Sequence, residues 1–291
     1  MSVQILQGDC LDVLATLDPE SVQCCVTSPP YWGLRDYGVS GQIGLEESPA
    51  AYVEKMVAVF REVRRVLKDD GTLWVNLGDS YSSYRDSKVS TQTVSGKRRG
   101  EPTERAANRN PDVLKASNLK HKDLVGIPWR VAFALQADGW YLRSDIIWHK
   151  PNPMPESVQD RPTKAHEYVF LLAKSERYYY DAEVIKEPVT GNAHARGGGV
   201  NPKDERNKRT IWTVPTAPYK DAHFATFPPA LIRPCVLAGC AQSETVLDPF
   251  AGSGTVGEVA EEEGRNSVLI ELNAEYVEMI RRRTAQMGLF A

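Results

Sequence analysis

A strand–turn–helix–strand pattern near the C-terminal end constrains the fold more than any other part of the chain. A short apolar run ends in Asp248, and Gly252 and Gly254 then form a turn before a predicted helix over residues 256–263. Glycines at these positions allow a tight turn and let a ligand approach the helix N-terminus closely. Glu271 ends a second apolar run 17 residues after Gly254, a spacing that suits a carboxylate at the ribose of a nucleotide. A dehydrogenase-type loop or a plain strand–helix turn is the alternative, although the third glycine of the dinucleotide fingerprint is missing.

The rest of the chain alternates predicted strands and helices, as a doubly wound sheet requires. A length of 291 residues and a hydrophobic content of 42% fit one large domain over residues 1–291. We therefore predict an α/β fold with a mostly parallel, doubly wound sheet. The predicted strands cover 22–26, 72–77, 144–148, 167–173 and 267–271, and the predicted helices cover 51–68, 129–136, 256–263 and 274–286.

A proline pair after the first of these strands is the second informative feature. Pro29 and Pro30 remove two backbone donors and fix φ, so the chain leaves the strand with free carbonyl groups. Ser28 adds a hydroxyl, and Tyr31 and Trp32 add flat apolar faces. Carbonyl acceptors beside an aromatic platform suit a planar base that carries an exocyclic amino group. A proline-kinked loop with two aromatic residues as a lid over the core is the alternative.

Together these two motifs resemble the S-adenosylmethionine-dependent amino methyltransferases of DNA. In that family Asp-Pro-Phe-Ala-Gly-Ser-Gly-Thr (residues 248–255 here) is the loop at the methionine part of the cofactor, and Ser-Pro-Pro-Tyr (28–31) is the catalytic loop. The catalytic loop comes more than 200 residues before the cofactor loop, which matches the circularly permuted beta group of the family. The resemblance extends to residues 71–79, 148–157 and 223–228. It implies a Rossmann-like class I methyltransferase fold.

The resemblance also implies roles for individual residues. Asp9 is expected near the adenine of the cofactor, Glu271 at its ribose and residues 248–254 around its methionine part. Residues 223–227 would close the far side, although for His223 a structural role is an equal alternative. The expected catalytic residues are Ser28, Pro29, Pro30 and Tyr31. The expected cofactor-binding residues are Asp9, Thr27, His223, Phe227, Asp248, Pro249, Phe250, Ala251, Gly252, Ser253, Gly254, Thr255, Glu271, Leu272 and Asn273, and no metal ligand is expected.

The expected reaction depends on hydrogen bonds that the loop 28–31 would accept from an exocyclic amine. An exocyclic amine is a poor nucleophile, and acceptance of its hydrogens by a carbonyl oxygen and the Ser28 hydroxyl would localise its lone pair. The target base must leave the duplex, with Tyr31 stacking on it. In the family, serine at the first loop position usually accompanies cytosine N4, whereas aspartate or asparagine accompanies adenine N6, so cytosine N4 is favoured. A nucleotide-dependent oxidoreductase and a non-catalytic DNA-binding protein remain the alternatives from other classes.

Two polar insertions, residues 82–123 and 188–213, interrupt the alternation. Residues 82–123 carry ten Lys and Arg against five Asp and Glu, and residues 191–210 carry five against two, although the whole chain has a net charge of −3. We expect both to contact DNA phosphates and bases, with a solvated surface insertion as the alternative. The arginine run 281–283 is interpreted as a solvated helix end. The DNA-binding candidates are Lys97, Arg98, Arg99, Arg105, Arg109, Arg161, Arg196 and Arg206.

Five cysteines lack metal-ligand spacing, so we expect buried, reduced thiols in a cytoplasmic protein. The N-terminus shows no signal pattern, and apolar runs such as 168–173 are too short to span a bilayer. The expected partner is therefore double-stranded DNA, with no membrane. A companion restriction endonuclease is a candidate partner, and the sequence leaves monomer and homodimer open.

Overall fold

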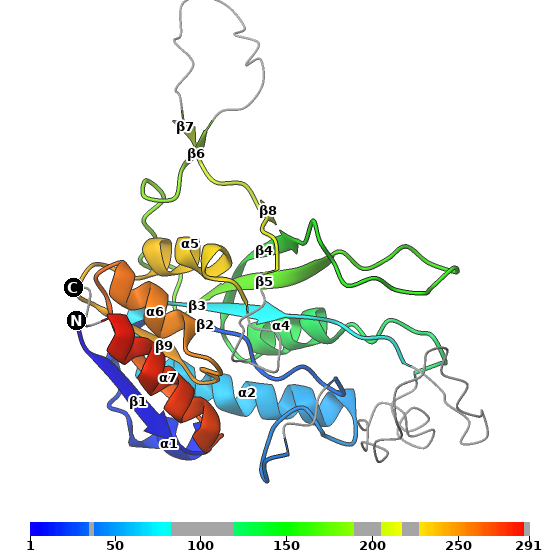
Figure 1. The fold of residues 1–291 in the computed structure, drawn as a ribbon, viewed down its shortest axis with the longest axis horizontal. Coiled ribbons are helices and arrows are strands. Elements are labelled where there is room, and N and C mark those ends of the chain that lie inside the picture. The colour runs from blue at the N-terminus through cyan, green and yellow to red at the C-terminus, as the bar shows by residue number, and fades with distance from the viewer. Residues whose placement is uncertain (35–37, 83–118, 189–204, 217–226, 288–291) are drawn as a thin grey trace, which may run out of the picture.

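One large sheet lies between two layers of helices (Figure 1). The structure, a computed structural model, describes residues 1–34, 38–82, 119–188, 205–216 and 227–287, with side chains described through 284. Within these residues only β5 runs antiparallel to its neighbours in the sheet. The strand order is β1 (Val3–Gln7), β10 (Asn266–Glu271), β9 (Thr245–Asp248), β2 (Val22–Thr27), β3 (Leu67–Leu77), β5 (His166–Ala173), β4 (Tyr141–His149) and β8 (Ile211–Thr213).

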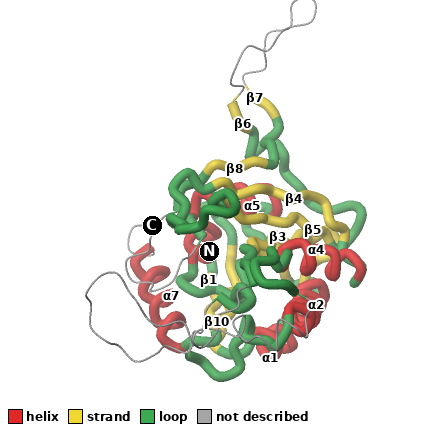
Figure 2. The backbone as a smooth tube through the Cα atoms, turned by 90° about the vertical axis from the view of Figure 1, so that its right-hand side faces the viewer, coloured by secondary structure: helices red, strands yellow, loops and turns green. Residues whose placement is uncertain are grey.

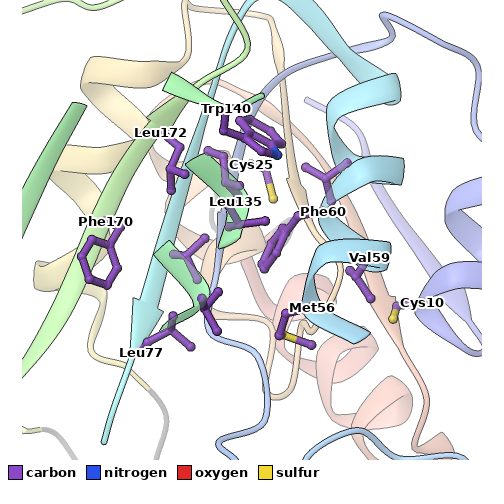
Figure 3. Close-up of a cluster of buried hydrophobic side chains, with 14 of the residues drawn as sticks. Cys10, Cys25, Met56, Val59, Phe60, Leu77, Leu135, Trp140, Phe170 and Leu172 are labelled. Atoms are coloured by element: carbon purple, nitrogen blue, oxygen red, sulfur yellow. The ribbon is translucent and has the colours of Figure 1, made fainter. Parts of the chain in front are cut away.

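Each face of the sheet has its own hydrophobic core. Cys24 and Cys25 are adjacent on β2, and their side chains belong to opposite clusters, as alternation along a strand requires. Figure 3 shows Cys25 among the large apolar side chains of one cluster. The predicted mostly parallel α/β fold is confirmed. One face is covered by α1 (Cys10–Thr16), α2 (Pro49–Val66) and α4 (Ile127–Ala137), and the other by α5 (Pro229–Gly239), α6 (Thr255–Glu262) and α7 (Ala274–Met287).

The boundary between α2 and β3 differs from the prediction. Ser48 caps α2 by accepting from the Ala51 backbone N–H at 3.1 Å, which fixes the start of the helix. The predicted end was residue 68 because the apolar spacing continues through Leu67. Leu67 instead has an extended backbone with ψ of 140°, is buried and pairs with Val22 of β2. The strand therefore begins five residues earlier than the predicted start at Thr72.

The strands β9 and β2 form the point at which the winding of the sheet reverses. They lie side by side and parallel, with Cys24 opposite Val246 and Cys25 opposite Leu247. The helix that follows β9, α6, packs on one face of the sheet, whereas α2 packs on the other face. The following loops therefore separate at the carboxyl ends of these two strands, where open α/β sheets bind ligands.

A small hairpin stands away from the main sheet (Figures 1 and 2). It consists of β6 (Glu187–Pro188) and β7 (Glu205–Arg206). The five cysteines are buried and free, as expected. Among the described residues, no helix combines the length and the apolar character needed to cross a membrane.

Candidate active site at the carboxyl ends of strands β9 and β2

The loop after β9 contains two glycines, and each is needed for a different structural reason. Both have a left-handed backbone, with φ of 52° at Gly252 and 80° at Gly254. A Cβ at Gly254 would lie 3.0 Å from Ile280 Cγ2 of α7, so this glycine permits close helix packing. A Cβ at Gly252 would meet only the Phe250 carbonyl oxygen, at 4.0 Å. The open space beside Gly252 is therefore where a ligand can approach the backbone.

Glu271 connects this loop to the end of β10. Its Oε2 accepts from the Gly252 backbone N–H at 2.8 Å, and its Oε1 accepts from the Asn273 backbone N–H at 2.8 Å. Burial raises the pKa of Glu271, against the effect of these hydrogen bonds. The neighbouring Gly8 N–H donates to the Glu271 carbonyl at 3.0 Å, and Asp9 caps α1 by accepting from a backbone N–H with one oxygen. The structure thus brings Asp9, Gly252 and Glu271 to the same edge of the sheet.

Asp248 links the loop after β9 to the end of β2. Its Oδ1 accepts from the Thr27 hydroxyl at 2.6 Å and from the Phe250 backbone N–H at 3.0 Å. Asp248 and Thr27 are both buried. Burial raises the pKa of Asp248 to about 7, because desolvation outweighs the two hydrogen bonds that stabilise its charged form.

Ser28 and Tyr31 lie in a polar network with Asn76 of β3, Glu167 of β5 and Lys150, which directly follows β4. The Tyr31 hydroxyl donates to Glu167 Oε2 at 2.8 Å and lies 3.1 Å from Asn76 Oδ1. The Ser28 Oγ lies 3.4 Å from Asn76 Oδ1 and 3.5 Å from the Tyr31 hydroxyl. The Lys150 ammonium pairs with the other oxygen of Glu167. Burial, followed by the negative charge of Glu167, raises the pKa of Tyr31 well above its usual range.

Residues next to this network hold the loop 28–32 in place. The buried Tyr52 hydroxyl donates to the Pro30 carbonyl at 2.9 Å. A Cβ at Gly78 would overlap the Tyr31 ring, so glycine is needed there for close approach. The expectation that Trp32 adds a flat apolar face to the site beside Tyr31 is wrong: Trp32 is buried in the core and donates to the Glu46 carbonyl at 2.9 Å.

Most of the expected cofactor residues gather at this edge of the sheet. Thr27 ends β2, residues 249–254 form the turn between β9 and α6, Glu271 ends β10, and residues 272–273 follow it. Phe227 packs against the core cluster on the α5 side. His223 lies outside the described residues. Within the described part of the chain, no group of three or more His, Cys, Asp and Glu side chains could hold a metal ion.

Arg283 is a residue whose role the sequence interpretation missed. Its guanidinium donates to the Ser253 carbonyl at 3.0 Å and pairs with Glu258, and its side chain is only 10% exposed. The interpretation of residues 281–283 as a solvated helix end is therefore wrong for Arg283. A signal was present, because Arg283 follows the inward-facing Ile280 by three residues and shares its helix face.

The DNA-binding candidates are described only in part. Arg161 pairs with Glu156 at 2.7 Å, and its guanidinium lies 3.8 Å from the centre of the Tyr81 ring. Arg206 donates to Glu187 at 2.9 Å across the β6–β7 hairpin. The remaining candidates, Lys97, Arg98, Arg99, Arg105, Arg109 and Arg196, lie outside the described residues.

Comparison with known proteins places this site in a family. The family model for DNA methylase matches residues 22–282. The Type II methyltransferase M.Cfr9I of Citrobacter freundii is 53% identical over 283 residues, which are 96% of this chain and 86% of that protein. The Type II methyltransferase M.SmaI of Serratia marcescens is 52% identical over 287 residues, 97% of this chain and 90% of that protein.

Two solved structures share the fold. The PvuII DNA methyltransferase (cytosine-N4-specific) has a TM-score of 0.69 at 20% identity and covers 97% of this chain and 86% of its own. A putative DNA modification methylase from Thermus thermophilus, complexed with S-adenosyl-L-methionine, has a TM-score of 0.60 at 23% identity. The match covers 98% of this chain and 95% of that protein's chain. The oxidoreductase and the non-catalytic DNA-binding protein therefore find no support. The match over most of the sequence shows that this chain belongs to the DNA methylase family and is a DNA methyltransferase.

Proposed function

We propose that this DNA methyltransferase transfers a methyl group from S-adenosylmethionine to the exocyclic N4 of a cytosine flipped out of duplex DNA. The observation that carries the proposal is the 2.6 Å hydrogen bond from Thr27 to Asp248. It joins the loop with the Ser28 hydroxyl to the loop with open space at Gly252. A donor in one loop and a base in the other would therefore meet at the carboxyl ends of β2 and β9.

The residues around Gly252 fit the cofactor. Each ionised carboxylate oxygen accepts more than one hydrogen bond, so Glu271 can receive the ribose hydroxyls while it keeps its two backbone donors. The α1 cap occupies one oxygen of Asp9, and the other is available to the adenine region. Residues 248–254 would surround the methionine part. When bound, S-adenosylmethionine supplies a methyl group already activated on a sulfonium.

The catalytic loop can orient the amine with two acceptors. Because Tyr52 already engages the Pro30 carbonyl, we assign the backbone acceptor to the Pro29 carbonyl. The Ser28 hydroxyl is the second acceptor, and Asn76 and Tyr31 lie close enough to hold its orientation. Two acceptors on the amine hydrogens direct the lone pair toward the methyl donor by positioning and electrostatics, without a covalent enzyme intermediate.

Cytosine N4 is preferred over adenine N6 on the identity of residue 28. Both bases present an amino group beside an unprotonated ring nitrogen, so the hydrogen-bond acceptors of the loop would suit either base. Serine at this position usually accompanies cytosine N4 in the family. The fold neighbour described as cytosine-N4-specific supports this choice. We propose further that the insertions 82–123 and 188–213 contact the DNA, since each carries a local excess of positive charge.

The proposal is tested by Ser28→Ala under single-turnover conditions. We expect the rate of methyl transfer to fall about 10²-fold, because an acceptor used most strongly in the transition state is removed. The affinities for S-adenosylmethionine and for DNA should stay nearly unchanged, which serves as the control for folding. A wild-type rate in Ser28→Ala would reduce this serine to a turn residue and overturn the mechanism.

A further inference from the structure

The loop between β4 and β5, residues 150–165, projects from the same edge of the sheet as the catalytic loop (Figure 1). The strands β2, β3 and β4 all point in one direction, because β5 is antiparallel to both β3 and β4. The loop is closed at its base by the Lys150 N–H, which donates to the Ala165 carbonyl at 2.8 Å. The Lys150 ammonium pairs with Glu167, which accepts the Tyr31 hydroxyl. The loop therefore begins next to the network that holds the catalytic tyrosine.

This loop is held in one conformation by prolines and by contacts at both ends. Three prolines in five residues, at positions 151, 153 and 155, fix φ along its first half. The Asn152 side chain exchanges two hydrogen bonds with the Thr216 backbone, at 3.0 and 3.3 Å. Glu156 accepts from Arg161 at 2.7 Å and from the Lys164 backbone N–H at 3.2 Å. A segment fixed in this way presents its remaining side chains at defined positions.

Met154 lies between two of these prolines and is 87% exposed. It is the most exposed of the large hydrophobic side chains in the described part of the chain. A single exposed apolar residue is ordinary on a protein surface. This one differs because it stands on an anchored loop at the active-site edge and has a long, unbranched side chain.

Two exposed lysines beside the loop can contact a polyanion, although each also pairs with an aspartate. Lys120 and Lys122 lie on the neighbouring segment, which is tied to the loop by the Lys122–Asp160 ion pair. Both lysine side chains are well exposed, so they can contact phosphates while the part of the loop around Met154 enters the duplex.

We propose that Met154 is a wedge that enters the DNA base stack and fills the gap left by the flipped base. Apolar side chains inserted between bases compensate for lost stacking, and an extruded base leaves such a gap. The inference rests on the proposed flipping of the target base. It assigns to the loop 150–165 a role in opening the duplex, separate from the chemistry at Ser28.

The test compares Met154→Ala with the wild-type enzyme on duplexes that carry the site that the enzyme methylates. Fluorescence of pyrrolocytosine, a cytosine analogue that still pairs with guanine, at the target position measures flipping, and titration measures affinity. On a fully paired duplex, Met154→Ala should reduce the flipped fraction or the affinity about tenfold or more. With an abasic site opposite the target, extrusion needs less help, and the difference should shrink to about twofold. Met154→Leu, which keeps an apolar wedge, should behave like the wild type.

Val184→Ala is the matched control, because Val184 is also an exposed apolar residue (49%) but lies between β5 and β6, outside the loop 150–165 and outside both insertions. It should change neither signal, and S-adenosylmethionine affinity should be unchanged in all three variants. Equal flipping and affinity of Met154→Ala and wild type on the paired duplex would overturn the wedge. If the wild-type enzyme itself produces no pyrrolocytosine signal, base flipping in the proposed function fails instead.

Discussion

Asp248→Asn should change how the stability of the protein depends on pH. Asparagine keeps an acceptor oxygen for the Thr27 hydroxyl and the Phe250 N–H but carries no charge at any pH. Asp248 is buried, and its pKa is raised from 3.8 to about 7. At about 1.4 kcal/mol per pKa unit, this interval corresponds to about 4 kcal/mol between the two limiting pH regimes.

The sign follows from where the protons are. Between pH 3.8 and about 7 the folded protein keeps the Asp248 proton that the unfolded chain has lost, so the free energy of unfolding falls as pH rises. This contribution is fully present below pH 3.8 and is lost as pH passes about 7. From about pH 5 to about pH 8, Asp248→Asn should therefore gain roughly 2–3 kcal/mol of stability relative to wild type.

Urea unfolding of the cofactor-free protein at these two pH values measures the effect. Asp18→Asn, which removes an exposed carboxylate of the same type, is the matched control. If the unfolding free energies of Asp248→Asn and wild type change in parallel with pH, Asp248 does not have the raised pKa that its burial implies.

Gly252→Val should abolish S-adenosylmethionine binding in isothermal titration, because its side chain enters the open space beside the loop. The left-handed backbone should cost only about 1–2 kcal/mol of stability, and unchanged affinity in the folded variant would refute the pocket. Tyr31→Phe removes the hydroxyl bound to Glu167 and should slow single turnover about 10- to 100-fold, as expected for a hydrogen bond to a charged group. Glu167→Gln keeps an acceptor and should slow it less; a wild-type rate in Tyr31→Phe would show that the hydroxyl does not position the loop. Deletion of residues 87–115 should spare cofactor binding and lower the log–log salt slope of DNA affinity by about 0.9 per lost phosphate contact, whereas an unchanged slope and site preference would place recognition in residues 196–209.

Both loops of the candidate site could be predicted from the sequence because each is short and contiguous. The prolines at 29 and 30 and the glycines at 252 and 254 restrict or free the backbone by themselves, whatever surrounds them. The alternation of strand and helix patterns likewise indicated the fold class. The expected convergence of Asp9 with these loops also appears in the structure, since parallel strands end at one edge.

The network around Tyr31 could not be predicted in the same way. Asn76 and Glu167 meet this tyrosine only because β5 lies beside β3 and β3 lies beside β2, an order set by the packing of the whole sheet. Trp32 was misread for a related reason: the pattern of a loop does not tell which of two adjacent aromatic rings turns into the core. Arg283 was misread because a run of three arginines suggests solvent unless its position on the helix face is considered.

The identity of the methylated base tests the central claim most directly. Purified protein is incubated with unmethylated DNA and S-adenosylmethionine, the DNA is digested to nucleosides, and the products are identified by mass spectrometry against N4-methylcytosine and N6-methyladenine standards. Ser28→Ala serves as the negative control. The expected product is N4-methylcytosine, formed by the wild type and strongly reduced in the variant. N6-methyladenine, or methylation that persists at the wild-type level in Ser28→Ala, would contradict the assignment of Ser28 as the acceptor that orients a cytosine amine.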